Sequence, residues 1–277
     1  MKIFTSGSET GSVDKGQEDV AKKESGFYKK IIVKISGGLF FLLVWYLLSC
    51  FDDSALILPS PLRVLRDFFV MVFSSDFWSD CGFSFLRCFS AFLISAFFAF
   101  IAGLWWGLYP FWRDFFSFFL NVIKSTPVIA LILLSVFWFG AGFVPVFAGF
   151  LMSFPVITEA IIGALDKFPL NMVEVCREFR LNGFSRLFKV YIPYITLPFL
   201  NAANTSLGIV WKVVVAGEVI SIPGRGLGAS LVESKNQIDI SGVFSSALAV
   251  VVFCWITAGL FSVLIKRFKP EKYVFPG

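Results

Sequence analysis

The sequence predicts an all-α, polytopic membrane protein with six transmembrane helices. Of the 277 residues, 57% are hydrophobic and only 16% are charged, whereas about a quarter of a soluble domain is charged. The mean hydropathy is +0.81. The apolar residues gather in runs of about 20, the length that crosses the hydrocarbon core of a bilayer as a helix. The 37 phenylalanines fit this prediction as apolar side chains of lipid-facing helices.

The two ends of the chain are polar. Residues 1–27 consist mainly of Ser, Gly, Lys, Glu and Asp, and lack the apolar core of a signal peptide. We therefore expect a disordered cytoplasmic tail over this stretch. The transmembrane domain is predicted over residues 28–272, and residues 273–277 form a short C-terminal tail.

Six apolar runs form the predicted spans. In chain order they cover residues 31–50, 83–108, 115–142 with a break at 125–127, 143–165, 197–222 and 243–265. Between the first two, Pro59 and Pro61 end a helix and Ser60 can cap a new one. Residues 62–77 then predict an amphipathic helix along the membrane surface.

The longest polar stretch of the apolar region covers residues 174–193 and lies inside a predicted loop, 166–195. Its positive charges are Arg177, Arg180, Arg186 and Lys189, with Lys167 just before it. Apolar residues recur at helical spacing on both sides of Asn182 and Gly183, which tolerate positive φ. This pattern predicts a helix-turn-helix that serves as a docking surface.

The distribution of Lys and Arg predicts the orientation. The N-terminal tail, the 166–195 loop and the C-terminal tail are rich in these residues, which mark the cytoplasmic side. An even number of spans places all three on one side. Both termini are therefore expected in the cytoplasm, with the loops at 51–80 and 223–240 outside.

Charged residues within spans require partners or water, because an intramembrane charge is costly. Lys212 and Glu218 are ~120° apart on one helix and cannot pair well with each other. We expect Glu159 as the partner of Lys212, and both a structural ion pair and a place in a solute pathway remain open. Arg87, near the start of its span, is expected to snorkel to the interface.

Several function classes are excluded. The chain contains no His, and its five Cys residues have no metal-ligand spacing. It also lacks the GxxxxGK[ST] phosphate-binding loop. We therefore predict no cofactor, no metal, no nucleic acid partner and no enzymatic activity of its own.

The polar stretch resembles the cytoplasmic EAA loop of ABC importer permeases. That pattern is Glu-Ala-Ala, three residues, Gly, nine residues, and Ile-x-Leu-Pro. Glu174 stands in place of its Glu, Val190 in place of its Ile, and Pro193 in place of its Pro. Arg180 occupies the position of the motif glycine, and Gly183 follows three residues later.

Other landmarks are similar to the nitrate, sulfonate and taurine branch of this family. They are Leu58-Pro59-Ser60-Pro61, Arg87, Ser125-x-Pro127, Trp138-Phe139-Gly140, Phe154-Pro155, Trp211 with Glu218, and Gly226-Leu227-Gly228. None of them is specific alone, but their order and spacing carry the resemblance.

The resemblance implies a permease subunit in the inner or plasma membrane. Its implied partners are a second permease copy, an ABC ATPase subunit, an extracytoplasmic solute-binding protein and membrane lipid. The implied ATPase-coupling residues are Glu174, Arg177, Phe179, Arg180, Gly183, Arg186, Leu187, Phe188 and Pro193. The expected path residues are Pro127, Glu159, Trp211, Lys212 and Glu218.

The resemblance leaves the solute open among nitrate, sulfonates, taurine, bicarbonate and vitamin precursors. The alternative is an ion-coupled secondary transporter that uses Glu159, Lys212 and Glu218 as coupling groups.

Overall fold

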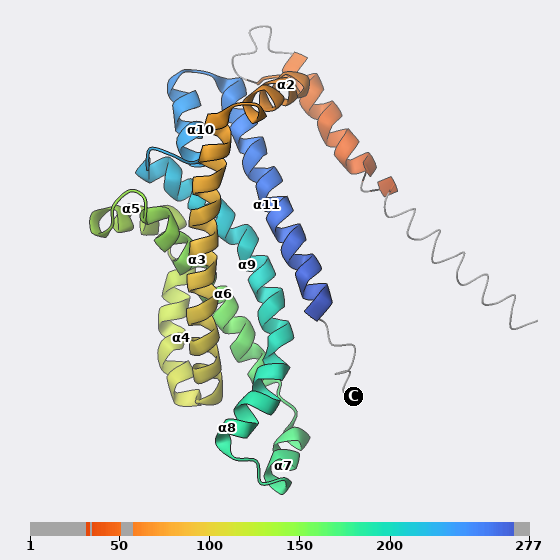
Figure 1. The fold of residues 1–277 in the computed structure, drawn as a ribbon, viewed down its shortest axis with the longest axis vertical. Helices are drawn as coiled ribbons and strands as arrows, with labels where there is room; N and C mark the ends of the chain where they lie inside the picture. Colours follow the sequence, from red (N-terminus) through yellow and green to blue (C-terminus); the bar gives the residue numbers. More distant parts are fainter. Residues whose placement is uncertain (1–31, 34, 51–57, 269–277) are drawn as a thin grey trace, which may run out of the picture. The chain divides into compact units, whose positions relative to one another are not determined.

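A computed structural model describes residues 32–33, 35–50 and 58–268 of the chain, and these residues contain helices and no strand (Figure 1). The chain divides into two compact units, residues 1–63 and residues 64–277.

The first unit contains an apolar helix, Ile35–Cys50. The Trp45 indole nitrogen donates a hydrogen bond to the Pro59 carbonyl over 3.2 Å. The helix is shorter than the 18 residues needed to count as a span by length. The start of the predicted first span and both predicted tails lie outside the described residues.

Two helices replace the single amphipathic helix predicted at residues 62–77. Helix α2 covers Pro61–Val72, and α3 covers Ser75–Leu108. The Ser74 hydroxyl accepts a hydrogen bond from the Phe77 amide, so this serine caps a new helix. The predicted boundary at residue 77 was wrong, and the second apolar helix begins eight residues before its predicted start at 83.

The core is formed by α3, α6 (Val144–Asp166) and α9 (Ile192–Ser221), which lie side by side in Figure 1. Small residues let their backbones approach closely, as is usual between membrane helices. A Cβ on Gly103 would lie 2.9 Å from the Ile161 Cβ, and one on Gly149 would lie 3.0 Å from the Ala91 Cβ. From the first contact pair, Ala91 with Gly149, to the second, Gly103 with Ile161, the residue numbers rise on both helices. Helices α3 and α6 therefore run parallel.

Helices α4 (Pro110–Ser125) and α5 (Val128–Trp138) meet at an angle of 101°. Thr126 and Pro127 separate them, and proline excludes the preceding residue from helical backbone. The predicted interruption of the third span at 125–127 is therefore confirmed as a sharp bend.

Three further elements follow α6: α7 (Leu170–Glu178), α8 (Gly183–Arg186) and the π-helical turn η1 (Leu187–Tyr191). After α9 come α10 (Leu227–Asn236) and α11 (Ile240–Phe268). Helix α10 corrects the sequence prediction, which treated residues 223–240 as a loop.

Four helices of the described chain are long and apolar enough to span a membrane, and the bent α4–α5 pair allows a fifth. The all-α membrane fold is thus confirmed. A count of six spans would also require Ile35–Cys50 to cross, and it stays a prediction.

Candidate functional site

The predicted docking surface corresponds to α7, α8 and η1, residues 170–191, here called the α7–η1 segment. It lies beyond the ends of α6 and α9, at the opposite end of those helices from α10 (Figure 1). Within the segment, the Asn182 side chain accepts a hydrogen bond from the Ser185 amide over 2.7 Å. Asn182 therefore caps α8 and has an ordinary φ of −67°.

The turn of this segment lies at Arg180, with φ 48°, and not at Asn182 and Gly183 as predicted. The Leu181 amide donates to the Cys176 carbonyl over 3.1 Å, and the Arg180 amide donates to the Arg177 carbonyl over 3.0 Å. These two bonds form a Schellman motif, which ends a helix with one left-handed residue, usually glycine. Arg180 therefore has the backbone conformation that a glycine would adopt without strain.

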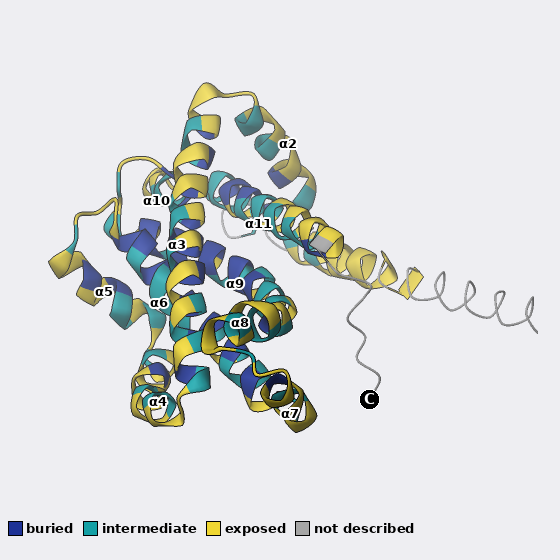
Figure 2. Cartoon of the chain, turned by 60° about the horizontal axis from the view of Figure 1, so that its bottom comes forward, coloured by how far each residue is buried: buried dark blue, intermediate teal, exposed yellow. Residues whose placement is uncertain are grey.

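Much of the α7–η1 segment is coloured as exposed in Figure 2, and its exposed residues include large aromatics. Phe179 is 73% exposed, Phe184 71% and Phe188 52%. The rings of Phe184 and Phe188 lie with their centroids 4.5 Å apart. Phe179 and Phe188 were predicted for docking and Phe184 was not, although its spacing of four from Phe188 was the available signal.

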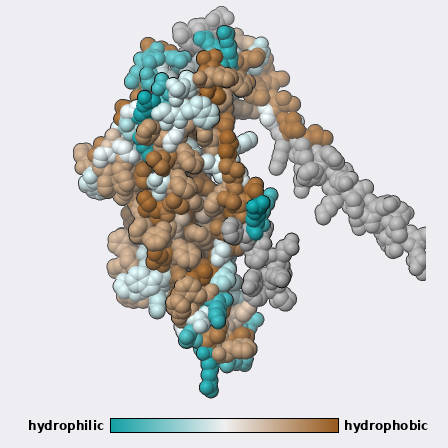
Figure 3. All heavy atoms as spheres, in the orientation of Figure 1, coloured by the Kyte–Doolittle hydropathy of each residue, from teal (hydrophilic) through white to brown (hydrophobic). Residues whose placement is uncertain are grey.

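The other residues predicted for docking lie on the same segment. Glu174, Arg177, Gly183 and Arg186 are exposed, and Leu187 is half-buried. The Arg186 guanidinium lies 5.8 Å from the centre of the Tyr191 ring. Figure 3 shows hydrophilic and hydrophobic atoms side by side at this end of the molecule.

Pro193 explains the π-helical turn before α9. Proline has no amide hydrogen, so it cannot donate to the carbonyl four residues before it. The Ile192 amide donates to the Leu187 carbonyl, five residues before it. Pro193 thus shapes the junction between the segment and α9.

Glu159 and Lys212 do not pair, so this expectation was wrong. Glu159 on α6 forms an ion pair with Lys124, near the end of α4, over 2.5 Å. Pro127 follows Lys124 at the 101° bend. The structure thus brings Glu159 close to the helix break.

Trp211 and Lys212 lie on different faces of α9. Trp211 is buried and its indole nitrogen donates to the Thr257 hydroxyl of α11 over 2.9 Å. This contact holds α9 against α11. Lys212 is exposed, and among the described residues it has no ion pair or hydrogen bond. Their place in a solute path stays a prediction.

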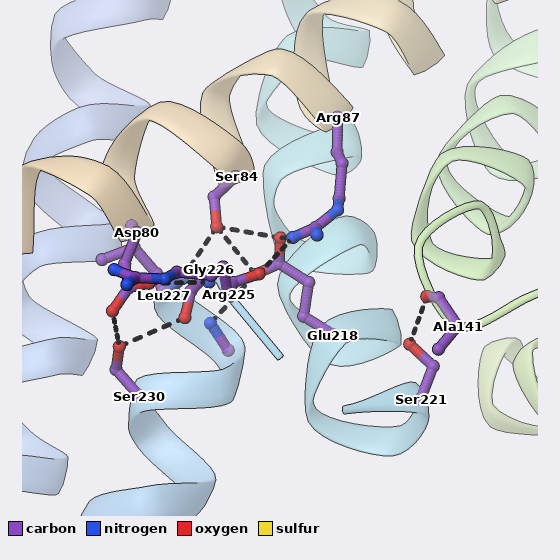
Figure 4. A network of polar contacts seen from close by, with 11 residues as sticks. Asp80, Ser84, Arg87, Ala141, Glu218, Ser221, Arg225, Gly226, Leu227 and Ser230 are labelled. Carbon is purple, nitrogen blue, oxygen red and sulfur yellow. Dashed lines mark hydrogen bonds and ion pairs between the residues drawn. The ribbon is translucent and has the colours of Figure 1, made fainter. Parts of the chain in front are cut away.

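Glu218 is the centre of a buried polar network, here called the Glu218 network (Figure 4). Its fully buried carboxylate lies 2.6 Å from the Arg87 guanidinium, whose side chain is 11% exposed. The Ser84 hydroxyl donates to the same carboxylate, as does the Gly228 amide over 2.9 Å. The expectation that Arg87 snorkels was wrong, since it binds Glu218.

The network joins three helices. Ser84 and Arg87 come from α3, Glu218 from α9, and the Gly228 amide from the first turn of α10. A negative charge at a helix N-terminus is favourable. The position of Ser84, three residues before Arg87, was the signal that could have predicted this face of α3.

A second carboxylate holds the loop before α10. Asp80 on α3 accepts hydrogen bonds from the Gly226 amide over 3.0 Å and from the Ser230 hydroxyl over 2.6 Å. The Arg87 guanidinium also donates to the Arg225 carbonyl over 2.7 Å.

The glycines of this loop have a steric explanation. Gly226 has φ 139°, and a Cβ there would lie 2.7 Å from the Arg87 guanidinium. A Cβ on Gly228 would lie 2.5 Å from the Glu218 Cβ. The Gly226-Leu227-Gly228 pattern is therefore explained by the Glu218 network.

Comparison with known proteins assigns the family. Residues 98–270 match the family of binding-protein-dependent transport system inner membrane components, which is more than half of the chain. The chain belongs to this family. It is an ABC importer permease subunit, and its apolar helices make it a multi-pass inner membrane protein.

The permease has relatives of nearly its own length. It is 25% identical to a putative ABC transporter permease protein of Methanocaldococcus jannaschii, over 86% of this chain and 88% of the relative. It is 26% identical to the taurine transport system permease protein TauC of Escherichia coli, over 76% and 78%. The putative aliphatic sulfonates transport permease protein SsuC of the same organism is 28% identical, over 71% and 76%.

Solved structures support the fold of the permease. A chain of the MetNI methionine ABC transporter, in an inward-facing conformation, superposes with a TM-score of 0.56 at 16% identity. The match covers 67% of the permease and 94% of that chain. The helical architecture is therefore that of a known ABC permease.

Replacing Arg180 with Gly is expected to stabilise α7 of the permease by about 1 kcal/mol, because glycine adopts the left-handed conformation without strain. Amide hydrogen exchange of α7 measures this as slower exchange. The control is Arg180→Ala, which removes the same charge but keeps a Cβ at positive φ. Equal exchange in the two variants would show that the backbone at Arg180 is not strained.

Proposed function

We propose that the permease forms the solute path of an ATP-driven importer as a homodimer and docks the α7–η1 segment of each copy onto an ABC ATPase subunit. The α7–η1 segment carries this proposal. Exposed apolar patches that are rimmed by polar residues mark interaction sites. Here Phe179, Phe184 and Phe188 are exposed on a segment that also carries exposed charges.

The geometry suits a mechanical role. The η1 turn at the end of the segment continues directly into α9, and α7 follows α6 after a short loop. Both α6 and α9 belong to the packed core, so a force on the segment acts on two core helices. Closure of two ATPase subunits would shift the dimer between inward-facing and outward-facing states.

The energy source is a partner, because the chain has no phosphate-binding loop of its own. The carboxylates Glu159 and Glu218 each have a basic partner, which supports ATP coupling over an ion-coupled transporter.

The relatives support the solute class. TauC and SsuC are named for taurine and aliphatic sulfonates, and we propose a small solute of this kind, delivered by an extracytoplasmic binding protein. The density of Lys and Arg supports an orientation with the α7–η1 segment and both termini in the cytoplasm.

Replacing Phe179 and Phe184 together with Ser tests the docking. Truncation of buried aromatic anchors at an interface commonly costs 2 kcal/mol or more, so we expect at least about tenfold weaker ATPase binding. The measurement is the amount of ATP-hydrolysing subunit that copurifies with the full-length permease from native membranes. ATP-driven uptake in proteoliposomes should fall together with the amount of copurified ATPase subunit.

The control for this double variant is Ile238→Ser. Ile238 is 74% exposed and lies between α10 and α11 in the chain. Helix α10 lies at the opposite end of the core helices from the segment (Figure 1). It should leave the copurified ATPase activity unchanged. Full retention of the ATPase by the Phe179→Ser, Phe184→Ser permease would contradict the docking proposal.

A further inference from the structure

Lys212 lies deep in α9. It precedes Ser221, the last residue of the helix, by nine positions, which corresponds to ~14 Å along the axis. The hydrocarbon core is about 30 Å thick. Because α9 is long and apolar enough to cross this core, Lys212 lies within its membrane-spanning part and not at its end.

The face of α9 that carries Lys212 points away from the packed core. At ~100° per residue, Asn201, Thr205 and Val219 lie within ~20° of Lys212. All four residues are exposed. The opposite face, including Val210 and Val214, is buried in the main core cluster with α3.

Neighbouring helices flank this face without covering it. On one side, Val213 packs in a cluster with Ile132 of α5 and Val144 of α6. On the other side, Trp211 is bonded to Thr257 of α11. Asn201, Thr205, Gly208 and Lys212 therefore form a strip of polar and small residues between α5 and α11, here called the Lys212 strip.

The charge of Lys212 has no counter-charge in the described chain. Helices α6 and α9 carry four charged residues: Glu159, Asp166, Lys212 and Glu218. Three of them have ion-pair partners, namely Lys124, Arg113 and Arg87. The strip thus has one uncompensated positive charge, a costly feature in lipid that usually faces water or a partner.

We propose that the Lys212 strip is an anion-binding station in the solute path, which selects solutes with a compact negative group such as a sulfonate, carboxylate or oxyanion. The ammonium attracts the anion and is the donor that binds it. The Thr205 hydroxyl already donates to the Asn201 carbonyl over 3.2 Å, and Asn201 lies ~16 Å along the helix from Lys212, so these two residues line the strip without contacting the same anion. The proposal rests on the proposed function and adds the residue that binds the negative group of the solute.

The test uses charged thiol reagents and needs no knowledge of the solute. Gly208 lies one turn from Lys212, and a Cβ there would meet nothing within 4 Å, so Gly208→Cys fits. The background replaces the five native cysteines with Ser or Ala. The full complex in proteoliposomes is treated with anionic sulfonatoethyl or cationic trimethylammonioethyl methanethiosulfonate, with and without ATP.

We expect both reagents to reach Gly208→Cys and the anionic one to react faster. Adding Lys212→Gln should lower the ratio of anionic to cationic rates by about an order of magnitude, because a unit charge ~6 Å away acts in opposite directions on the two reagents. Lys212→Arg should preserve the ratio. Lys235→Gln, which removes an exposed positive charge on α10, should also preserve it.

Two results would overturn the proposal. If the ratio of anionic to cationic reaction rates is the same with and without Lys212, the strip is accessible to water but does not select solutes by charge. If neither reagent reaches Gly208→Cys in any state while Gly224→Cys reacts, the strip faces lipid or protein. ATP-driven uptake by the same complex reports on the proposed function separately, so the two failures are distinguishable.

Discussion

Replacing Glu218 with Ala is expected to destabilise the permease by about 3–5 kcal/mol, the usual cost of leaving one member of a buried ion pair alone. Arg87 would keep its charge at 11% exposure without a carboxylate. The Ser84 hydroxyl and the Gly228 amide would also lose their acceptor. The measurement is the midpoint of thermal unfolding in detergent, followed by tryptophan fluorescence.

Two further variants separate the causes of this loss. Glu233→Ala removes an exposed carboxylate from α10 and should change the stability by less than about 0.5 kcal/mol. The double variant Arg87→Met, Glu218→Met removes both charges and should recover much of the stability, as apolar replacements of buried ion pairs often do. A Glu218→Ala permease as stable as the parent would mean that water reaches Arg87.

Replacing Gly217 with Val is expected to destabilise the permease by about 3 kcal/mol through overpacking. A Cβ at this position would lie 2.8 Å from the Pro145 Cα. Backbone atoms of a proline cannot move aside as a flexible side chain can, so α9 must shift away from α6. The shift would also displace Glu218, the next residue, from Arg87. Thermal unfolding in detergent measures the loss.

Gly208→Val is the matched control on the same helix, because a Cβ at Gly208 meets nothing within 4 Å. It introduces the same β-branched side chain and should leave the unfolding midpoint nearly unchanged. Equal losses in the two variants would show that the α6–α9 distance is not set by Gly217.

The helical positions followed closely from the sequence. The predicted spans at 143–165, 197–222 and 243–265 correspond to α6, α9 and α11 within a few residues. Apolar runs of this length have few alternatives in a membrane, where every backbone group needs an internal partner. The α7–η1 segment was also predictable, since charge and helical spacing coincide there.

The errors concern short helices and turns. Helix α10 was missed because residues 223–240 are rich in glycine and charge, and its start depends on contacts with Asp80 and Glu218. The turn of the α7–η1 segment was placed at Asn182 and Gly183 by their tolerance of positive φ. The structure places it at Arg180, because the amides of Arg180 and Leu181 bind carbonyl groups of the last turn of α7 and end that helix.

By itself, the sequence determined the class of the protein, the approximate limits of its long helices and the position of the charged α7–η1 segment, because these depend on local composition and periodicity. Only the tertiary structure decided the partners of the charged residues. Arg87 and Glu218 are 131 positions apart, as are many pairs that never meet, and no local pattern specifies which helices come together. The packing of α3, α6 and α9 at their small residues brings the two charges into contact and leaves Lys212 on the uncovered face.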